Sequence, residues 1–321
     1  MESLSIEDPP EEAIEIRNVV IIGSGVAGYV AAIYTARAML NPLMVNGYMY
    51  GGQLMTTTDI ENYPGFVDGI SGPKLMGLFY EQSKRFGTEF AHSDVKSIDT
   101  SSRPFEITLS TGYVLFSHSI IIATGARALW LDIAGEEKLR SRGVSTCATC
   151  DGAFYKDCDI VVVGGGDTAM EEATFLTRYA TKVTIVHRKD TFKASKIMLE
   201  RAKQNTKIDW KTNSQIVKYI QDDSDELCGV IIKDNDGVES KLDCKGVFVA
   251  IGHKPSTDFL TGSGVELDMN GYILHMTNTM TSVDGIFAAG DVVDTVYKQA
   301  ITAAGQGCQA AIDCIKWLDD I

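Results

Sequence analysis

The chain has 321 residues, which is enough for two domains of about 150 residues each. Its composition of 45% hydrophobic and 22% charged residues, with 30 Gly against 7 Pro, is typical of an α/β enzyme rather than of a disordered or fibrous chain. A formal net charge of -14 would repel nucleic-acid phosphates and anionic lipid headgroups, so we expect no nucleic-acid and no membrane partner.

The N-terminal segment, residues 1–17, is acidic and contains Pro9-Pro10. It has neither the apolar stretch of a signal peptide nor the basic character of a transit sequence. We expect a solvated arm that is dispensable for the chemistry. No apolar run in the chain approaches the roughly 20 residues that a membrane span needs. The missing targeting signal predicts a cytoplasmic location.

A first nucleotide-binding turn follows the first predicted strand. Residues 18–22 are apolar, Gly23-Ser24-Gly25-Val26-Ala27-Gly28 comes next, and residues 29–39 have helical composition. In this order of strand, GxGxxG turn and helix, Gly23 permits the tight turn, Gly25 lets the backbone approach a pyrophosphate, and Gly28 allows close helix packing. The N–H groups at the helix start then bind the negative charge.

The same arrangement returns later in the chain. Residues 159–163 form the predicted strand, Gly164-Gly165-Gly166-Asp167-Thr168-Ala169 the turn, and residues 170–179 the helix. One such turn alone can be a packing turn. Two copies, each between a strand and a helix, indicate two dinucleotide-binding modules. The sequence therefore predicts an α/β fold with two Rossmann-like domains.

The two modules differ in charge at the end of their second strand. In the second module the predicted strand 182–186 runs into basic residues, whereas the equivalent position of the first module is Asn46. Basic side chains here accommodate a 2′-phosphate, which predicts NADPH over NADH; a solvated basic turn is the alternative. The amide of Asn46 can bond a ribose hydroxyl, which leaves FAD as the candidate for the first module. The basic residues are His187, Arg188, Lys189 and Lys193, of which His187 is equally well explained as a strand end.

Further segments favour a flavin site in the first module. Loops dense in glycine and polar groups let the backbone approach a planar ligand. A predicted strand that ends in Gly290-Asp291 places a carboxylate where it can accept from a polyol, and a helix of small residues to about Trp317 follows. The loops and strand ends are Gly51-Gly52-Gln53, Glu61-Asn62-Tyr63-Pro64-Gly65-Phe66, Thr124-Gly125-Ala126 and Gly285–Asp291.

The seven cysteines are an odd number, which does not suggest a secreted disulfide framework. Cys147 and Cys150 form one CxxC motif, which fits a redox pair, half of a zinc site or an unused close pair. No second CxxC and no His pair at metal spacing follows, so zinc is disfavoured. We expect the remaining five to be small buried apolar residues; they are Cys158, Cys228, Cys244, Cys308 and Cys314.

From about Val19 to Trp317 the chain resembles the low-molecular-weight thioredoxin reductases of bacteria, fungi and plants. The most diagnostic motif is Cys147-Ala148-Thr149-Cys150-Asp151, placed just ahead of the second glycine-rich turn. The sequence departs from the usual pattern by a Val26 in place of Pro and by lysines in place of frequent arginines, which keep the charge but lose the bidentate fork. These lysines are Lys189, Lys193 and Lys298. The other motifs are Gly23-Ser24-Gly25, Gly51-Gly52-Gln53, Glu61–Phe66, Ala123-Thr124-Gly125-Ala126, Gly164-Gly165-Gly166-Asp167, His187-Arg188-Lys189 and Ala289-Gly290-Asp291.

The resemblance implies an NADPH domain of residues 126–249 that is inserted into a discontinuous FAD domain of residues 18–125 and 250–321. It also implies a thioredoxin-disulfide reductase, in which NADPH reduces FAD, the flavin reduces a Cys147–Cys150 disulfide, and the dithiol reduces thioredoxin. In the family, the inserted domain rotates between the half-reactions and the protein is a homodimer.

The resemblance further implies the site residues. Cys150 would face the flavin and Cys147 would attack thioredoxin, with Asp151 as the acid or base for the thiol protons and a turn-capping carboxylate as the alternative. No metal ligands are expected. The residues expected at FAD or NADPH are Ser24, Gly25, Val26, Ala27, Gly51, Gly52, Gln53, Asn62, Val95, Ala123, Thr124, Gly125, Gly164, Gly165, Gly166, Asp167, Thr168, His187, Arg188, Lys189, Lys193, Gly290, Asp291, Lys298, Gln299 and Ala300.

Two other functions compete with this one. A reductase of the same fold could act on a peroxiredoxin-linked protein, a ferredoxin-dependent enzyme or a small-molecule disulfide. The second alternative is not an enzyme but a flavin-bound redox sensor or binding module without turnover. The CxxC motif beside Asp151 disfavours it.

Overall fold

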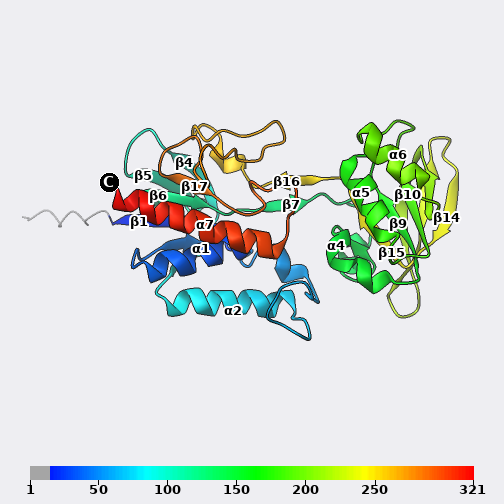
Figure 1. The fold of residues 1–321 in the computed structure, drawn as a ribbon, viewed down its shortest axis with the longest axis horizontal. Coiled ribbons are helices and arrows are strands. Elements are labelled where there is room, and N and C mark those ends of the chain that lie inside the picture. Colours follow the sequence, from blue (N-terminus) through cyan, green and yellow to red (C-terminus); the bar gives the residue numbers. More distant parts are fainter. Residues whose placement is uncertain (1–14) are drawn as a thin grey trace, which may run out of the picture. The chain divides into compact units, whose positions relative to one another are not determined.

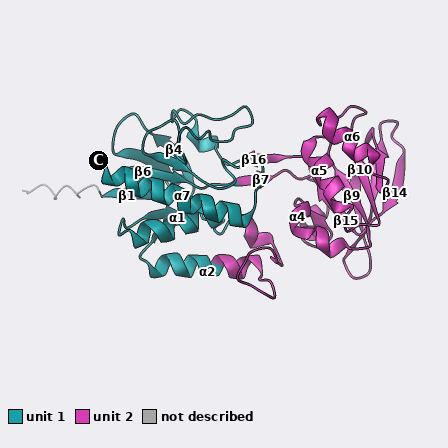
Figure 2. Ribbon diagram, in the orientation of Figure 1, with its two compact units in different colours: residues 1–52, 77–125, 255–321 teal, residues 53–76, 126–254 magenta. Residues whose placement is uncertain are grey.

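The computed structural model describes residues 15–321. The greater part of the predicted N-terminal arm, residues 1–14, lies outside the described residues. The chain divides into two compact units, drawn in different colours in Figure 2. Each unit is built on its own sheet, whose central strands are parallel, so the predicted α/β fold with two Rossmann-like halves is confirmed.

Apart from residues 53–76, which group with the second unit, the chain passes from one unit to the other at two places, after Gly125 and after Lys254. Strands β7 (Ala126–Ala128) and β16 (His253–Pro255) lie at these places and pair with each other in a two-stranded sheet. The first unit comprises the chain up to Gly52, Gly77–Gly125 and Pro255–Ile321, and the second comprises Gln53–Met76 and Ala126–Lys254.

This division differs from the expected boundaries in two respects. The second passage follows Lys254 rather than residue 249, because β16 pairs with β7 and continues the connection. Residues 53–76 group with the second unit. Hydrogen bonds account for this grouping: Gln53 Nε2 donates to the Ala126 carbonyl, and Ser141 Oγ donates to the Thr56 carbonyl at 3.2 Å.

The sheet of the first unit has seven strands in the order β3-β2-β1-β6-β5-β4, with β17 also paired to β6. Its central strands are parallel and apolar, because both faces are covered and each inward side chain is buried; residues 19–22 of β1 are all 3% exposed or less. Strands β4 and β5 extend the sheet antiparallel. The bounds are β1 Ile16–Ile22, β2 Leu43–Val45, β3 Glu89–Ala91, β4 Val95–Asp99, β5 Phe105–Leu109, β6 Val114–Ile122 and β17 Ile286–Ala288.

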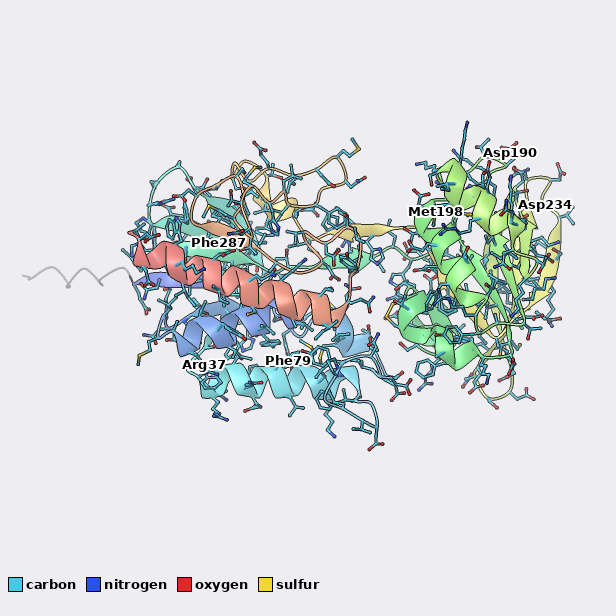
Figure 3. The ribbon with its side chains drawn as sticks, in the orientation of Figure 1. Arg37, Phe79, Asp190, Met198, Asp234 and Phe287 are labelled. Carbon is cyan, nitrogen blue, oxygen red and sulfur yellow. A yellow bond between two sulfur atoms is a disulfide. The ribbon has the colours of Figure 1, made fainter. Side chains whose placement is uncertain are left out.

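Two helices pack together on this sheet, α1 (Val26–Arg37) and α7 (Ala300–Asp319), and both are visible in Figure 1. Their backbones approach closely, since a Cβ at Gly307 would lie 2.2 Å from the Ala27 carbonyl oxygen. Phe287 of β17, labelled in Figure 3, meets Trp317 of α7 edge to face, with 6.4 Å between the ring centroids. The helix α2 (Gly72–Arg85) belongs mainly to this unit and the short 3-10 helix η3 (Asp258–Leu260) wholly, whereas the 3-10 helix η1 (Gln53–Thr56) belongs to the second unit.

The second unit has a five-stranded parallel sheet in the order β11-β10-β9-β15-β8. Helices α5 (Asp167–Leu176) and α6 (Lys196–Gln204) contribute to an apolar core with this sheet, and a three-stranded antiparallel sheet, β12-β13-β14, contributes to another. The expected strands 159–163 and 182–186 are found with those bounds as β9 and β10. The remaining bounds are α3 Glu136–Leu139, β8 Val144–Ser145, α4 Ala148–Asp151, η2 Gly152–Tyr155, β11 Ile208–Lys211, β12 Ser214–Gln221, β13 Leu227–Asp234, β14 Glu239–Asp243 and β15 Gly246–Val249.

The five scattered cysteines are free thiols, but the expectation that all of them are buried is wrong. Cys244 and Cys314 are buried, whereas the other three are half-buried. Cys158 stands in the connection between η2 and β9 and Cys308 on α7, where the packing leaves one side open to solvent. The third is Cys228, on β13.

Candidate active site

Cys147 and Cys150 are joined by a disulfide. Strand β8 ends at Ser145, and the helical turn α4 begins directly after Cys147, so the motif stands at the exit of a parallel strand. The backbone closes around it: the Cys147 N–H donates to Ser145 Oγ at 3.0 Å, and the Asp151 N–H donates to the Cys147 carbonyl at 3.2 Å. The pairing makes this CxxC an oxidised two-electron centre of the second unit.

Asp151 closes the same turn. Burial raises the pKa of its carboxyl, and a hydrogen bond with the Ser145 side chain opposes the shift. A carboxyl whose pKa is raised holds its proton nearer to neutral pH, which suits proton exchange with a neighbouring thiol. Asp151 also precedes η2, where it makes no side-chain capping hydrogen bond.

The first glycine-rich turn joins β1 to α1. Gly23 has φ +107°, and a Cβ there would lie 2.3 Å from the Ala123 carbonyl oxygen, so only glycine fits between the two strand ends. At Gly25, the N-cap of α1, a Cβ would meet no described atom within 4 Å. The first N–H groups of α1 have no partner within the helix, and this turn therefore suits a pyrophosphate.

A buried serine ties three parts of this turn together. Ser24 Oγ donates to the Asn46 carbonyl at 2.7 Å and accepts from the Gly51 N–H at 3.0 Å. The Asn46 side chain is 3% exposed, and its Oδ1 and Nδ2 have no hydrogen-bond partner among the described residues. A buried amide without partners costs free energy, and a ribose hydroxyl would satisfy it. Asn46 thus stands where a dinucleotide ligand fits.

Asp291 follows β17 in the same unit. Burial raises the pKa of Asp291 to about 6, the Asp294 carboxylate adds to the shift, and Lys298 opposes it. Gly290 donates its N–H to Gln306 Oε1 at 2.7 Å, which connects this strand end to α7. A carboxyl at this place can bond a hydroxyl group.

The segment before α7 was only partly anticipated. Lys298 has φ +48°, its pKa is lowered by burial, and its Nζ lies 5.5 Å from the Tyr272 ring centroid. Gln299 is the N-cap of α7 in a reciprocal capping box with Thr302. Asp294, which the sequence analysis did not single out, accepts the N–H groups of residues 296, 297 and 298 at 2.8 to 2.9 Å. The sequence feature that could have identified Asp294 is its position three residues after Asp291.

The second glycine-rich turn joins β9 to α5 with the same geometry. A Cβ at Gly164, φ +155°, would lie 2.3 Å from the Ala250 carbonyl oxygen, and a Cβ at Gly166 would meet no described atom within 4 Å. Asp167 Oδ1 accepts from the Ser195 N–H at 2.7 Å, and the Lys193 N–H donates to the Gly165 carbonyl at 2.8 Å. The loop after β10 is thereby folded back onto the turn.

That loop carries the basic cluster. His187 Nε2 lies 3.1 Å from the Thr191 carbonyl oxygen, and its ring stacks on Phe192 at 5.0 Å. Figure 3 labels Asp190, which stands in the same loop. Three cations of the loop are exposed and take part in no ion pair with any residue in the described part of the chain. They are Arg188, Lys189 and Lys193, and they suit a phosphate group.

The remaining expected cofactor residues lie beside these turns or in the loops. Val26 and Ala27 are buried in the first turn of α1, and Thr124 Oγ1 donates to the Ser256 carbonyl at 2.8 Å. Val95 begins β4 opposite Leu109. The others are Gly52, whose added Cβ would lie 3.2 Å from Gly25 Cα, Gln53 in η1, Asn62 in the loop between η1 and α2, the buried Ala123, Gly125 with φ +68°, Thr168 in the first turn of α5, and Ala300 at the start of α7.

Residues 15–321 contain no group of three or more His, Cys, Asp or Glu side chains arranged to hold a metal ion. In the same part of the chain, no helix has both the length and the apolar character required to cross a bilayer.

Comparisons with known proteins identify the family of the chain. The family model described as pyridine nucleotide-disulphide oxidoreductase matches residues 17–307. The chain is 53% identical to the thioredoxin reductase of Mycolicibacterium smegmatis over 305 residues, which cover 94% of this chain and 97% of that one. It is 50% identical to the thioredoxin reductase of Rickettsia conorii, covering 94% and 98%.

Solved structures agree as well. The thioredoxin reductase from Giardia duodenalis superposes with a TM-score of 0.91 at 42% identity, covering 95% of this chain and 99% of that one. The thioredoxin reductase from Streptococcus pyogenes superposes with a TM-score of 0.90 at 38% identity, with the same coverage. The chain belongs to the pyridine nucleotide-disulphide oxidoreductase family and, within it, to the thioredoxin reductases.

Proposed function

We propose that this chain is an NADPH-dependent thioredoxin-disulfide reductase whose redox centre is the Cys147–Cys150 pair. The observation that carries the proposal is this disulfide, closed beside Asp151 in a chain that also has two dinucleotide turns. Over one turnover, NADPH, a proton and a thioredoxin disulfide become NADP+ and a thioredoxin dithiol. Bound FAD supplies the step that protein side chains cannot perform, which is the acceptance of a hydride and the delivery of an electron pair to a disulfide.

The first turn would hold FAD. Its pyrophosphate would lie at the N-terminus of α1 beside Gly25, the orphaned Asn46 amide would bond a ribose hydroxyl, and Asp291 would bond the polyol. The further residues proposed at FAD are Ser24, Val26, Ala27, Gly51, Gly52, Gln53, Asn62, Val95, Ala123, Thr124, Gly125, Gly290, Lys298, Gln299 and Ala300.

The second turn would hold NADPH. Its pyrophosphate would lie at the N-terminus of α5, and the cations of the loop after β10 would hold the 2′-phosphate that distinguishes NADPH from NADH. The chain carries a net charge of -14, so a loop with three exposed cations contrasts with its overall negative charge and suits a phosphate group. The residues proposed are Gly164, Gly165, Gly166, Asp167, Thr168, His187, Arg188, Lys189 and Lys193.

The two cysteines would divide the chemistry. When the disulfide takes up an electron pair, its S–S bond breaks and the two sulfurs gain protons, with Asp151 exchanging a proton at Cys150. The Cys147 thiolate then attacks the thioredoxin disulfide, and Cys150 resolves the mixed disulfide, which restores the Cys147–Cys150 bond. The first step leaves the enzyme reduced, and the second passes the same electron pair to thioredoxin and returns the enzyme to its oxidised form.

The two units would correspond to the two cofactors. The first unit together with residues 53–76 would be the FAD domain, and residues 126–254 of the second unit would be the NADPH domain, connected by β7 and β16. The disulfide and the second turn belong to the same unit, and both must reach the flavin, so we propose that this unit rotates on the two connecting strands. We further propose a homodimer in the cytoplasm, with no membrane partner.

The absorption spectrum and a coupled assay test the proposal together. We expect a yellow protein whose flavin band is bleached anaerobically by NADPH much faster than by NADH, and which reduces oxidised thioredoxin with NADPH. A polypeptide that is colourless and does not take up supplied flavin would contradict the function. A coloured protein that reduces a small disulfide but not thioredoxin would contradict only the choice of partner.

Rotation has a separate test. A cross-link introduced between the two units should stop steady-state turnover while one half-reaction continues. If the steady-state rate survives the cross-link, then rotation is not required.

A further inference from the structure

Three of the free thiols gather at one place in the second unit. Cys158, Cys228 and Cys244 all line one hollow, which has a volume of about 320 Å³. The first directly precedes β9, the second lies on β13, and the third stands between β14 and β15. The fold thus brings together nucleophilic side chains from three separate segments, and the reaction proposed above uses none of them.

This hollow is separate from the redox motif and from the nucleotide turn of the same unit. Strands β8, β9 and β15 run parallel in one sheet. Cys158 and Cys244 come before β9 and β15, so they lie at the amino ends of these strands, whereas Cys147 follows β8 and the second glycine-rich turn follows β9. The thiols and the active site therefore occupy opposite edges of the sheet.

The strand register places Cys228 opposite Cys244. Strands β13 and β14 are antiparallel, and Gly229 pairs with Asp243. Cys228 precedes Gly229 and Cys244 follows Asp243, so the two cysteines occupy the next opposite positions along these strands. Opposite residues of antiparallel strands have Cα atoms about 4.5 to 5.5 Å apart. A disulfide joins Cα atoms about 4.4 to 6.8 Å apart, so this placement suits one.

The backbone at both cysteines can adjust to such a bond. Ile220 pairs with Gly229 and Gln221 with Leu227, so the register between β12 and β13 skips Cys228 and forms a bulge there. A bulge leaves its extra residue unpaired. Cys244 lies in the connection between two strands rather than within either. A small movement that brings the two sulfurs together therefore disturbs little of the sheet.

Cys158 is less suited as the partner of Cys244. The Lys245 N–H donates to the Asp159 carbonyl at 2.8 Å, so Cys158 and Cys244 also lie on neighbouring segments. However, Cys158 Sγ donates to the Lys156 carbonyl at 3.4 Å, which directs this thiol toward its own turn. The register and the bulge favour Cys228 instead.

The exposure of the two thiols divides their roles. Cys228 is half-buried, so a small oxidant can reach it. Cys244 is 3% exposed, and burial raises the pKa of its thiol to about 12, with Asp243 and Cys228 adding to the shift. The thiolate is the reactive form of cysteine, and a buried thiol is inert toward dissolved reagents. Cys228 therefore reacts first, and Cys244 reacts with a sulfur that is already beside it.

We propose that Cys228 and Cys244 are a second redox pair of this protein, which hydrogen peroxide converts from a dithiol to a disulfide. The Cys228 sulfur attacks the peroxide, so that an S–O bond forms, the O–O bond breaks and water leaves. Cys244 then attacks the sulfenic sulfur of Cys228, so that the S–S bond forms, the S–O bond breaks and a second water leaves. The two thiols lose two electrons and two protons, and the peroxide becomes two waters. A dithiol reopens the bond by exchange.

The test identifies the linked cysteines directly. The flavin-loaded protein is treated with hydrogen peroxide, its remaining thiols are alkylated, and it is digested with trypsin without reduction for mass spectrometry. Trypsin cleaves after lysine, and Lys156, Lys233 and Lys241 separate the three cysteines into different peptides. We expect the peptides 219–233 and 242–245 to be alkylated before the treatment and linked after it, and dithiothreitol should release them again.

Three variants separate the steps. In Cys228→Ser, loss of the Cys244 thiol should slow by about tenfold or more, because the buried thiol has no oxidised sulfur beside it. In Cys244→Ala, no thiol resolves the sulfenic acid, so Cys228 should proceed to the sulfinic acid. Cys308→Ser removes a half-buried free thiol of the first unit and is the matched control, in which the link should form as in the unaltered protein.

Three results overturn the proposal. They are a linked peptide that contains Cys158, oxidation of Cys228 in the unaltered protein without a link to Cys244, and a Cys228 that stays fully alkylated after peroxide. Each is read in the unaltered protein, so none depends on the folding of a variant. The readout concerns these thiols alone, and it decides the pair even if thioredoxin reduction, measured in the same preparation, is absent.

Discussion

The two glycine-rich turns share one backbone device and differ in what surrounds it. In each, the first glycine sits where a Cβ would lie 2.3 Å from a carbonyl oxygen that follows another strand, and a Cβ on the third residue of the turn, directly before the helix, would meet no described atom within 4 Å. Around the first turn stand the orphaned amide of Asn46 and the buried carboxyl of Asp291. The second is bordered by the exposed cations Arg188, Lys189 and Lys193.

We propose that this difference determines which dinucleotide each turn binds. Backbone N–H groups at a helix start bind any pyrophosphate, so the turns alone do not distinguish two dinucleotides. Neutral or acidic groups suit hydroxyls, and cations suit a further phosphate. The second unit also differs in that it carries the disulfide. A substitution at the disulfide should therefore abolish thioredoxin reduction without changing what the first unit binds.

The largest expected effect separates the two units by half-reaction. Cys150→Ser should reduce NADPH-dependent thioredoxin reduction to background, because no disulfide remains to accept electrons. Anaerobic bleaching of the flavin band by NADPH should continue, which a stopped-flow spectrum will show. Cys158→Ser, a free thiol outside the motif, is the control and should keep full activity. Loss of flavin bleaching in Cys150→Ser would contradict this separation.

The basic loop comes next. Replacing Arg188, Lys189 and Lys193 by alanine should raise the KM for NADPH by about tenfold for each cation lost, since a charge-assisted hydrogen bond to phosphate contributes about 1.5 to 3 kcal/mol. The KM for NADH, which lacks the 2′-phosphate, should change little. Lys203→Ala, exposed on α6, serves as the control. An equal loss for both nucleotides would show that the cluster does not select the phosphate.

A pair of glycine substitutions tests the turns against each other. Gly25→Ala and Gly166→Ala both add a Cβ that meets no protein atom within 4 Å, so both proteins should fold. The methyl group should instead obstruct a pyrophosphate. We expect Gly25→Ala to weaken FAD retention and Gly166→Ala to weaken NADPH binding, each by about tenfold or more. Calorimetric titration of each ligand measures the effect, and the opposite pairing of ligands would refute the assignment.

The last prediction concerns the stability of the flavin-free protein rather than its activity. The folded pKa of Asp291, about 6, lies above the ordinary value of about 3.9, so the folded state binds the proton more tightly than the unfolded state. The stability that this provides is present below about pH 4 and is lost as the pH rises to about 6, on the order of 3 kcal/mol. Denaturant unfolding from pH 4 to 7 should show this decline, and Asp291→Asn should lack it. An identical pH profile in the two proteins would contradict the buried environment of Asp291.

The sequence predicted the elements around the nucleotide turns well, because their signals are local. Strands β9 and β10 have the expected bounds, and α1 and α5 begin within the turns that were expected to precede them. Residues 53–76 were harder to assign, since their grouping depends on hydrogen bonds to Ala126 and Ser141, far away along the chain. Burial of Cys158, Cys228 and Cys308 was overestimated, because a cysteine does not reveal from sequence which side of its element it occupies.

By itself, the sequence determined the two strand, turn and helix modules, the CxxC motif and the basic loop, because each is encoded within a few adjacent residues. Only the tertiary structure decided that Ser24 joins Asn46 to Gly51 and that burial acts on Asp291. These contacts join residues distant in the chain, and their energies depend on the removal of water, which no local pattern records.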